Sequence, residues 1–214
     1  MAKKNQLIIF DMDGTLIDSG DVITNTINYV RKNLGLTQLD KKTMLTQLNN
    51  PHINSADFFY GTSKFTDKQT KLFEDYYEQN CTKDIKIYDG IKQLLEELNT
   101  KYILSVATNA ATIYAKQMLQ AVGIDKYFDY IIGFDKVTNP KPSQEMIVKT
   151  LEYFDIIPNN ALVVGDSHKD SISAKKANVK PILVNWGFTD HSDNVISNTI
   201  DLKKEIDDYF NTNR

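Results

Sequence analysis

The sequence predicts an α/β fold with a parallel sheet, helices on both of its faces and a helical domain inserted after the first strand. Short apolar runs bounded by turn residues are typical of buried strands. They fall at residues 6–10, 103–107, 130–133, 161–165 and 181–184. Helical patterns separate the later runs, and this alternation favours a Rossmann-like parallel core. No strand-like run occurs between residues 15 and 85, which predicts an inserted α-helical domain there.

The predicted core domain is therefore discontinuous, with residues 1–14 and 86–214 flanking a helical domain at 15–85. In the helical domain, apolar residues at helical spacing over 22–34 predict one helix, which Gly35 ends. A second is predicted between Thr66 and Asn80. In the core we expect helices over 91–98, 112–121, 143–153 with Ser143 as N-cap, from 165 to about 177, and near 202–209.

Composition is that of an ordinary globular protein, with 41% hydrophobic and 25% charged residues. The net charge of -3 gives no reason to expect a nucleic-acid partner. Cys81 is the sole cysteine, so neither a disulfide nor a cysteine zinc site is expected. No apolar run has the length of a signal-peptide core or a membrane span, and we expect no membrane partner and a cytoplasmic location. The oligomeric state is not readable, and a monomer is compatible with the sequence.

Two carboxylates, Asp11 and Asp13, directly follow the first predicted strand and precede Gly14. Alone, such a pair is most often a surface turn. At the end of a buried strand, however, two close carboxylates raise each other's pKa unless a cation is bound. Oxygen ligands of this kind suit Mg²⁺. The pair therefore indicates a magnesium site if other groups gather at the same edge.

Polar groups do follow the other predicted strands. Thr108 and Asn109 follow the second, and Asp166 and Asp170 follow the fourth. Lys141 precedes the fourth strand and stands between two prolines, which restrict its backbone. Singly, these residues could cap helices or form a turn. Together they fall on one sheet edge, where open α/β sheets bind ligands, and they predict a site for a phosphate and a metal.

These motifs resemble the four motifs of the haloacid dehalogenase superfamily of phosphohydrolases, in a phosphoglycolate phosphatase-like arrangement. The motifs are Asp11-Met12-Asp13-Gly14-Thr15, Thr108, Lys141 and Gly165-Asp166-Ser167-His168-Lys169-Asp170. The predicted helical domain at 15–85 resembles the cap that this superfamily carries after its first motif. The resemblance thus covers nearly the whole chain, and the cap is its least specific part.

The resemblance implies a role for each residue. Asp11 would attack phosphorus and form an aspartyl-phosphate, and Asp13 would protonate the leaving oxygen and then activate water. Lys141, Thr108 and Asn109 would bind and neutralise the phosphate. Mg²⁺ would be held by Asp11, the backbone carbonyl of Asp13, and Asp166. Asp170 would ligate the metal through water or only orient Lys141.

Within the superfamily, Asp13 favours phosphoryl transfer over dehalogenation, because a halide needs no proton to leave. The resemblance therefore implies a Mg²⁺-dependent phosphatase acting on a small phosphorylated metabolite. The alternatives are a phosphosugar mutase, an inorganic pyrophosphatase, or a non-catalytic phosphate-binding or regulatory protein. A mutase would bind a second phosphate with cap cations, and Arg31, the only cap arginine, is expected to be solvated. A phosphonatase would need an apolar cap lysine, and none of Lys41, Lys42, Lys64, Lys68 and Lys71 has such a setting.

The segment 46–52 is the best candidate for substrate contacts from the cap, because it is expected between two cap helices and is rich in hydrogen-bonding groups. Asn49, Asn50 and His52 are its candidate residues. An ordinary Asn-Pro turn explains the same residues equally well. The Gly-rich loop often seen here in phosphoglycolate-type enzymes is absent, which counts against phosphoglycolate itself as the substrate.

Overall fold

The computed structural model describes residues 4–188 and 196–212. A five-stranded sheet in the order β5-β4-β1-β6-β7 lies at its centre, and every pairing in it is parallel. Its strands are β1 Leu7–Phe10, β4 Ile103–Ala107, β5 Tyr130–Ile132, β6 Ala161–Gly165 and β7 Lys180–Leu183. Each predicted strand is present within one or two residues, so the predicted α/β core is confirmed.

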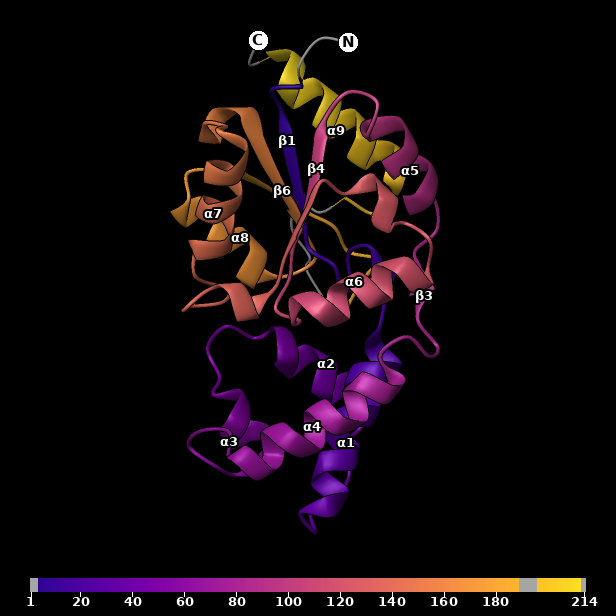
Figure 1. Cartoon of the computed structure of the whole chain (residues 1–214), viewed down its shortest axis with the longest axis vertical. Coiled ribbons are helices and arrows are strands. Elements are labelled where there is room, and N and C mark those ends of the chain that lie inside the picture. The colour runs from indigo at the N-terminus through magenta and orange to yellow at the C-terminus, as the bar shows by residue number, and fades with distance from the viewer. Residues whose placement is uncertain (1–3, 189–195, 213–214) are drawn as a thin grey trace.

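Helices cover both faces of this sheet (Figure 1). On one side of the view lie α5, α6 and α9, and on the other lie α7 and α8. Their bounds are α5 Ile91–Leu98, α6 Thr112–Ala121, α7 Glu145–Phe154, α8 His168–Lys176 and α9 Thr199–Thr212. Short 3-10 turns occupy Asp125–Tyr127, Phe134–Lys136 and Pro158–Asn160.

Strand β1 shows why this sheet is buried on two sides. Successive side chains of a strand point to opposite faces. Ile8 and Phe10 belong to the apolar cluster beneath α5, α6 and α9, whereas Leu7 and Ile9 belong to the cluster beneath α7 and α8. All four are fully buried, which explains why the strand reads as a continuous apolar run rather than as an alternating one.

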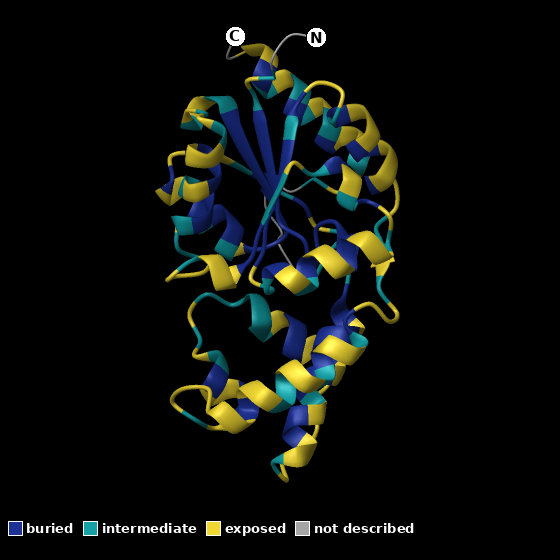
Figure 2. Ribbon diagram, viewed as in Figure 1, coloured by how far each residue is buried: buried dark blue, intermediate teal, exposed yellow. Residues whose placement is uncertain are grey.

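A separate group of helices lies beyond the carboxyl ends of the strands (Figure 1). We call it the helical unit; it comprises α1 Gly20–Asn33, α2 Lys41–Asn49, α3 Ser55–Tyr60 and α4 Asp67–Asn80. Its surface is largely exposed, with a narrow buried seam between the helices (Figure 2). At the edge of that seam the rings of Tyr29 in α1 and Tyr76 in α4 stack at 4.4 Å, with Tyr29 exposed and Tyr76 half-buried. Local caps define its helices: Asp40 begins α2, Asn54 begins α3, and Thr66 with Gln69 forms a capping box for α4.

The two segments that join the helical unit to the sheet pair with each other. Strand β2, Ile17–Asp18, runs antiparallel to β3, Lys86–Ile87. Strands of two residues are too short to give a periodic pattern in the sequence, so this two-stranded ribbon was not predicted. It holds the two connections side by side at the base of the helical unit.

Three local expectations were wrong. Helix α7 begins at Glu145 rather than at Ser143, with Gln144 in the N-cap position, although the Ser143 hydroxyl does accept from the Glu145 backbone N–H at 3.3 Å. Residues 46–49 lie within α2 and not between helices. The last helix, α9, is longer than expected. Its residues Leu202, Ile206 and Phe210 form one buried face, which extends the helix along the core. No helix among the described residues is both long and apolar enough to cross a membrane.

Candidate active site at the carboxyl ends of the strands

A buried ion cluster stands where β1 and β6 end. The backbone N–H of Asp11 continues the sheet by donating to the Val164 carbonyl at 2.8 Å. The Asp11 side chain forms an ion pair with Lys141. The Lys141 Nζ lies 2.6 Å from Asp11 Oδ1 and 2.6 Å from Asp170 Oδ1. The lysine side chain is only 4% exposed. Three residues far apart in the sequence therefore form one ion network, as the strand-end pattern predicted.

This cluster also supplies oxygen atoms for a divalent cation. Carboxylate oxygens of Asp11, Asp166 and Asp170 all lie within 4.8 Å of one another, and all three residues are buried. Hard cations such as Mg²⁺ take carboxylate oxygens. Both oxygens of Asp170 already have partners, because Oδ1 binds Lys141 and Oδ2 accepts from the backbone N–H and hydroxyl of Ser167. Asp11 and Asp166 are thus better suited to direct ligation than Asp170.

Glycines make room around Asp166. Gly14 has φ +85°, and a Cβ there would lie 2.3 Å from Asp166 Oδ2. A Cβ on Gly187 would lie 2.0 Å from the Gly14 carbonyl oxygen. The backbone N–H of Phe188 donates to Asp166 Oδ2 at 3.1 Å. The loop after β7 therefore packs onto the first motif and orients Asp166, a contribution that no motif in the sequence indicated.

Asp13 is held by two hydroxyl groups. Ser19 Oγ donates a short hydrogen bond to Oδ1, and Thr108 Oγ1 donates to Oδ2 at 3.4 Å. Burial raises the pKa of Asp13, whereas the hydrogen bond from Ser19, the charge of Lys141 and the bond from Thr108 lower it. The net effect is a raised pKa, which suits a group that must both donate and accept a proton. Ser19 was missed from the sequence, since a serine before a helix reads as an N-cap.

The charges of Asp11 and Lys141 depend on each other. Burial raises the pKa of Asp11 well above its usual value; Lys141 opposes this shift, and Asp170, Asp166 and Asp13 add to it. For Lys141, burial alone would lower the pKa, but Asp11 and Asp170 raise it above its ordinary value, so the lysine stays charged. One cation among four carboxylates leaves an excess of negative charge, which a bound divalent cation would offset.

Asn109 lies in the site but its side chain has a different partner from the expected phosphate. Its Oδ1 accepts from the backbone N–H of Lys141 at 3.0 Å, and its Nδ2 donates to the Lys141 carbonyl at 2.9 Å. This reciprocal pair fixes the backbone of the lysine. The Asn109 side-chain amide is thereby engaged, and only the backbone N–H of this residue is left as a phosphate donor.

The candidate substrate contacts from the cap, Asn49, Asn50 and His52, differ in their surroundings. Asn50 forms a local turn, accepting from the backbone N–H of His52 at 3.0 Å and donating to Gln47 Oε1 at 3.2 Å. His52 is exposed, and Asn49 is half-buried at the end of α2.

Arg31 was expected to be solvated, and that was wrong. Only 8% of it is exposed, and its guanidinium donates to the carbonyls of Thr37 and Phe59. The cap lysines considered above are all exposed.

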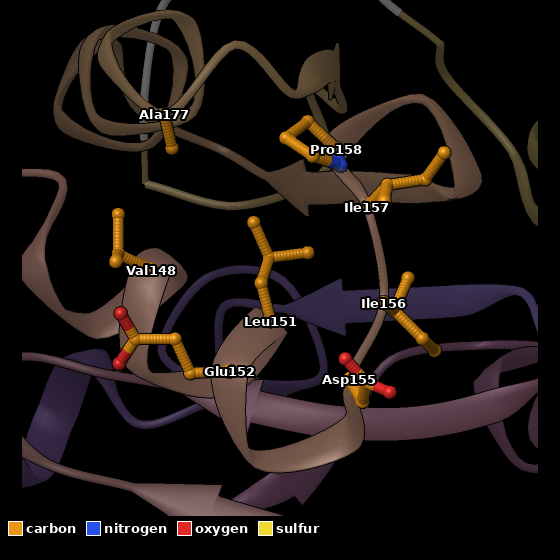
Figure 3. Close-up of a pocket in the computed structure, with 8 residues that line it drawn as sticks. All are labelled: Val148, Leu151, Glu152, Asp155, Ile156, Ile157, Pro158 and Ala177. Carbon is orange, nitrogen blue, oxygen red and sulfur yellow. The ribbon is translucent and has the colours of Figure 1, made fainter.

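A shallow groove of about 320 Å³ lies elsewhere on the core, between α7, α8 and the loop before β6 (Figure 3). Leu151, Ile156, Ile157 and Pro158 form most of its apolar wall. The loop leads into the start of β6, so the groove lies at the opposite edge of the sheet from the ion cluster. Glu152 and Asp155 are its only charged residues, and we assign it no chemistry.

Comparison with known proteins agrees with this geometry. The haloacid dehalogenase-like hydrolase family model matches residues 8–184. A phosphoglycolate phosphatase from Aquifex aeolicus is 31% identical over 96% of this chain and 98% of its own length. The pyrophosphatase PpaX of Oceanobacillus iheyensis is 26% identical over 95% of this chain and 97% of its own. A Clostridium acetobutylicum crystal structure, titled a predicted phosphatase, has a TM-score of 0.83, 26% identity and coverage of 96% and 100%. Both the sequence and the fold therefore place this chain in the haloacid dehalogenase-like hydrolase family.

Proposed function

We propose that this protein is a Mg²⁺-dependent phosphatase that hydrolyses the phosphate ester of a small metabolite through an aspartyl-phosphate on Asp11. The observation that carries the proposal is the placement of one carboxylate, Asp11, against both a buried ammonium group and a second candidate metal ligand, Asp166. The family and the named relatives supply independent support.

In the first step, an oxygen of Asp11 forms a bond to phosphorus while the bond to the leaving oxygen breaks. Asp13 donates its proton to that oxygen, and its raised pKa favours the protonated form that this step needs. In the second step, Asp13 takes a proton from water, whose oxygen forms a bond to phosphorus while the bond between phosphorus and the Asp11 oxygen breaks, which releases inorganic phosphate and restores the Asp11 carboxylate. A divalent cation would be held by Asp11, Asp166 and the backbone carbonyl of Asp13, and it would offset the negative charge of the phosphoryl oxygens.

Three further residues prepare these steps. Lys141 offsets the charge of Asp11 and is fixed through its backbone by Asn109 and through its ammonium by Asp170. Asp170 is in turn oriented by Ser167. Thr108 has its hydroxyl near Asp13 and donates to a phosphate oxygen when the substrate is bound. We assign Asp170 to positioning, with at most a water-mediated contact to the metal.

Residues 15–85 act as a cap in this proposal. The helical unit faces the carboxyl ends of the strands, and the β2–β3 ribbon gives it a two-stranded attachment to the core. A cap in this position excludes water and contacts the leaving group. Substrate choice would therefore depend on residues at the boundary between the helical unit and the sheet.

An inorganic pyrophosphatase is the second candidate, because relatives of that name match most of the chain. Phosphoglycolate and pyrophosphate, the compounds named in the two sets of relatives, both carry a second anionic group beside the reacting phosphate. A mutase is less well supported, because Arg31 is engaged by backbone carbonyls and is not free to bind a second phosphate. A purely regulatory protein would not need both Asp11 and Asp13.

The test is an assay of the purified full chain with p-nitrophenyl phosphate and then with a metabolite panel that includes phosphoglycolate, sugar phosphates and pyrophosphate. We expect turnover that requires Mg²⁺, is lost in chelator, and is lost in Asp11→Asn. A folded wild-type protein that turns over no compound in Mg²⁺ would contradict the proposal. Transfer of phosphate between positions of a sugar bisphosphate, without release, would indicate the mutase instead.

A further inference from the structure

One lysine reaches from the core into the helical unit. Lys169 lies in the first turn of α8, next to Asp170 of the ion cluster. Its Nζ donates to the backbone carbonyl of Leu48 at 2.6 Å. That carbonyl lies in the last turn of α2, where carbonyl groups lack helical partners and attract cations. Lys169 is half-buried in this position. A cation from the catalytic edge thus stands at the boundary between core and helical unit.

Lys169 differs from Lys141 in how its charge is offset. Lys141 lies between two carboxylates, whereas Lys169, among the residues that the structure describes, forms no ion pair and contacts a neutral carbonyl. Burial and then the charge of Lys141 lower the pKa of Lys169, and Asp170 and Asp11 act in the opposite direction. The ammonium group is therefore within electrostatic range of the reacting residues while lacking an anionic partner of its own.

The Lys169 ammonium group can donate further hydrogen bonds. It carries three N–H donors, and the Leu48 carbonyl takes one. A partly desolvated cation with a single neutral acceptor gains from a nearby anion. Attack by Asp11 comes from the sheet, so the leaving group must depart in line on the side of the helical unit. Leu48 belongs to the helical unit, and Lys169 therefore reaches toward the leaving-group side of the site.

We propose that Lys169 binds a second anionic group of the substrate, a carboxylate or a second phosphate carried by the leaving group. The inference deepens the proposed function and rests on it for the position of the reacting phosphate. It narrows the substrate class to small phosphate esters or anhydrides with a second negative charge close to the scissile bond. Lys169 keeps its bond to Leu48, so substrate binding also holds the end of α2 against the core.

Equilibrium binding tests this without requiring turnover. Calorimetry at a fixed free Mg²⁺ concentration would compare phosphonoacetate and methylenediphosphonate, which carry a second anion, with methylphosphonate, which does not. The proteins are wild type, Lys169→Met, Lys169→Arg and Lys175→Met. The last removes an equally charged but exposed lysine of the same helix. Thermal unfolding of each variant checks that it is folded.

We expect Lys169→Met to weaken binding of the two second-anion ligands by about 10- to 100-fold, the range for a charged hydrogen bond. Binding of methylphosphonate should change by less than about twofold, because this ligand has no second anion for Lys169 to bind. Lys169→Arg should retain part of the affinity, and Lys175→Met should retain all of it. The ligand with the larger loss tells whether a carboxylate or a phosphate is the natural group.

Two results would overturn the inference. An equal loss for all three ligands would mean that Lys169 only holds α2 in place. No loss for any ligand would mean that Lys169 does not reach the bound anion. Neither result bears on hydrolysis, which is measured separately with p-nitrophenyl phosphate, so failure of this inference and failure of the proposed function are distinguishable.

Discussion

The ion pairs at the carboxyl edge of the sheet and those in the helical unit differ in how far they are exposed to solvent. At the sheet edge, Lys141 and Asp11 form an ion pair with side chains 4% and 10% exposed. In the helical unit, Lys41 and Asp21 form one with side chains 45% and 60% exposed. The first pair joins residues 130 positions apart, and the second joins neighbouring helices. Buried charges are costly and often mark functional sites. The buried charge of the helical unit, Arg31, is satisfied instead by the backbone carbonyls of Thr37 and Phe59.

The largest expected effect tests the sheet edge alone. Asp11→Asn keeps the size of the side chain but removes the proposed nucleophile, so we expect kcat to fall by about 10⁴-fold or more. Asp21→Asn, in the helical unit, is the matched control and should leave kcat unchanged. Both are measured with p-nitrophenyl phosphate after circular dichroism has shown that the variants are folded. An active Asp11→Asn variant would remove Asp11 from the mechanism.

The two ion pairs should differ in their effect on stability. Lys141→Met leaves Asp11 and Asp170 without their cation, and breaking a buried pair in this way costs about 3–5 kcal/mol of unfolding free energy. Lys41→Met breaks the exposed pair and should cost less than about 1 kcal/mol. Urea unfolding of both variants without metal measures the difference. Equal losses would show that burial does not distinguish the two regions.

The stabilisation of the sheet edge by a bound metal should depend on pH. The pKa of Asp11 is raised above its ordinary value of 3.8, so its contribution to stability is fully present below that value and is lost as pH rises through the raised pKa. Mg²⁺ binds the ionised form, and at about 100 times its Kd it adds about 2.7 kcal/mol. Thermal unfolding should thus show more stabilisation by Mg²⁺ at about pH 8 than at about pH 5, since protons compete for Asp11. Asp166→Asn should remove the effect, and a pH-independent stabilisation would contradict it.

A smaller effect is expected for Ser19. Removing its hydroxyl takes away a hydrogen bond that lowers the pKa of Asp13, so that pKa should rise further. We expect Ser19→Ala to reduce kcat/KM by about tenfold, the size of one hydrogen bond to a charged group, and to move the Asp13 limb of the pH profile to higher pH. Thr150→Val removes a hydroxyl that is equally buried, in α7, and serves as the control. A lower rate with an unmoved profile would indicate a purely structural role.

The smallest effect is expected in the helical unit. His52 is exposed, and only its backbone N–H has a hydrogen-bond partner among the described contacts, in Asn50. His52→Ala should change kcat/KM for any substrate by less than about twofold. A tenfold loss of kcat/KM for one substrate of the metabolite panel would instead identify His52 as a substrate contact.

The comparison also separates what the sequence could predict from what it could not. Strand ends were readable because an apolar run locates a strand, and parallel strands bring residues such as Asp11, Thr108 and Asp166 to one edge. Their side-chain partners were not readable. Ser19 precedes a helix and looks like an N-cap, yet its hydroxyl bonds Asp13. The side chain of Asn109 bonds the backbone of Lys141, a contact that the sequence did not indicate, and its role as a phosphate donor stays a prediction.

The helical unit was harder to predict for a physical reason. Helical periodicity predicts which face is buried but not what a long side chain reaches. Arg31 lies on the buried face of α1 and donates to the carbonyls of Thr37, in the loop after α1, and Phe59, in α3. Lys169 reaches across the boundary to Leu48, a contact between residues 121 positions apart. The Arg31 contacts depend on how the helices of the helical unit pack together, and the Lys169 contact depends on how that unit sits on the core; local sequence encodes neither.

The central claim is that Asp11 becomes covalently phosphorylated. Its most direct test is rapid acid quench of the full chain during turnover of a phosphate ester in Mg²⁺, followed by mass spectrometry of the digested protein. We predict one phosphoryl group on the peptide that contains Asp11, formed only with Mg²⁺ and absent from Asp11→Asn. Steady turnover with no phosphorylated peptide, or with the phosphoryl group on any other residue, would contradict the claim.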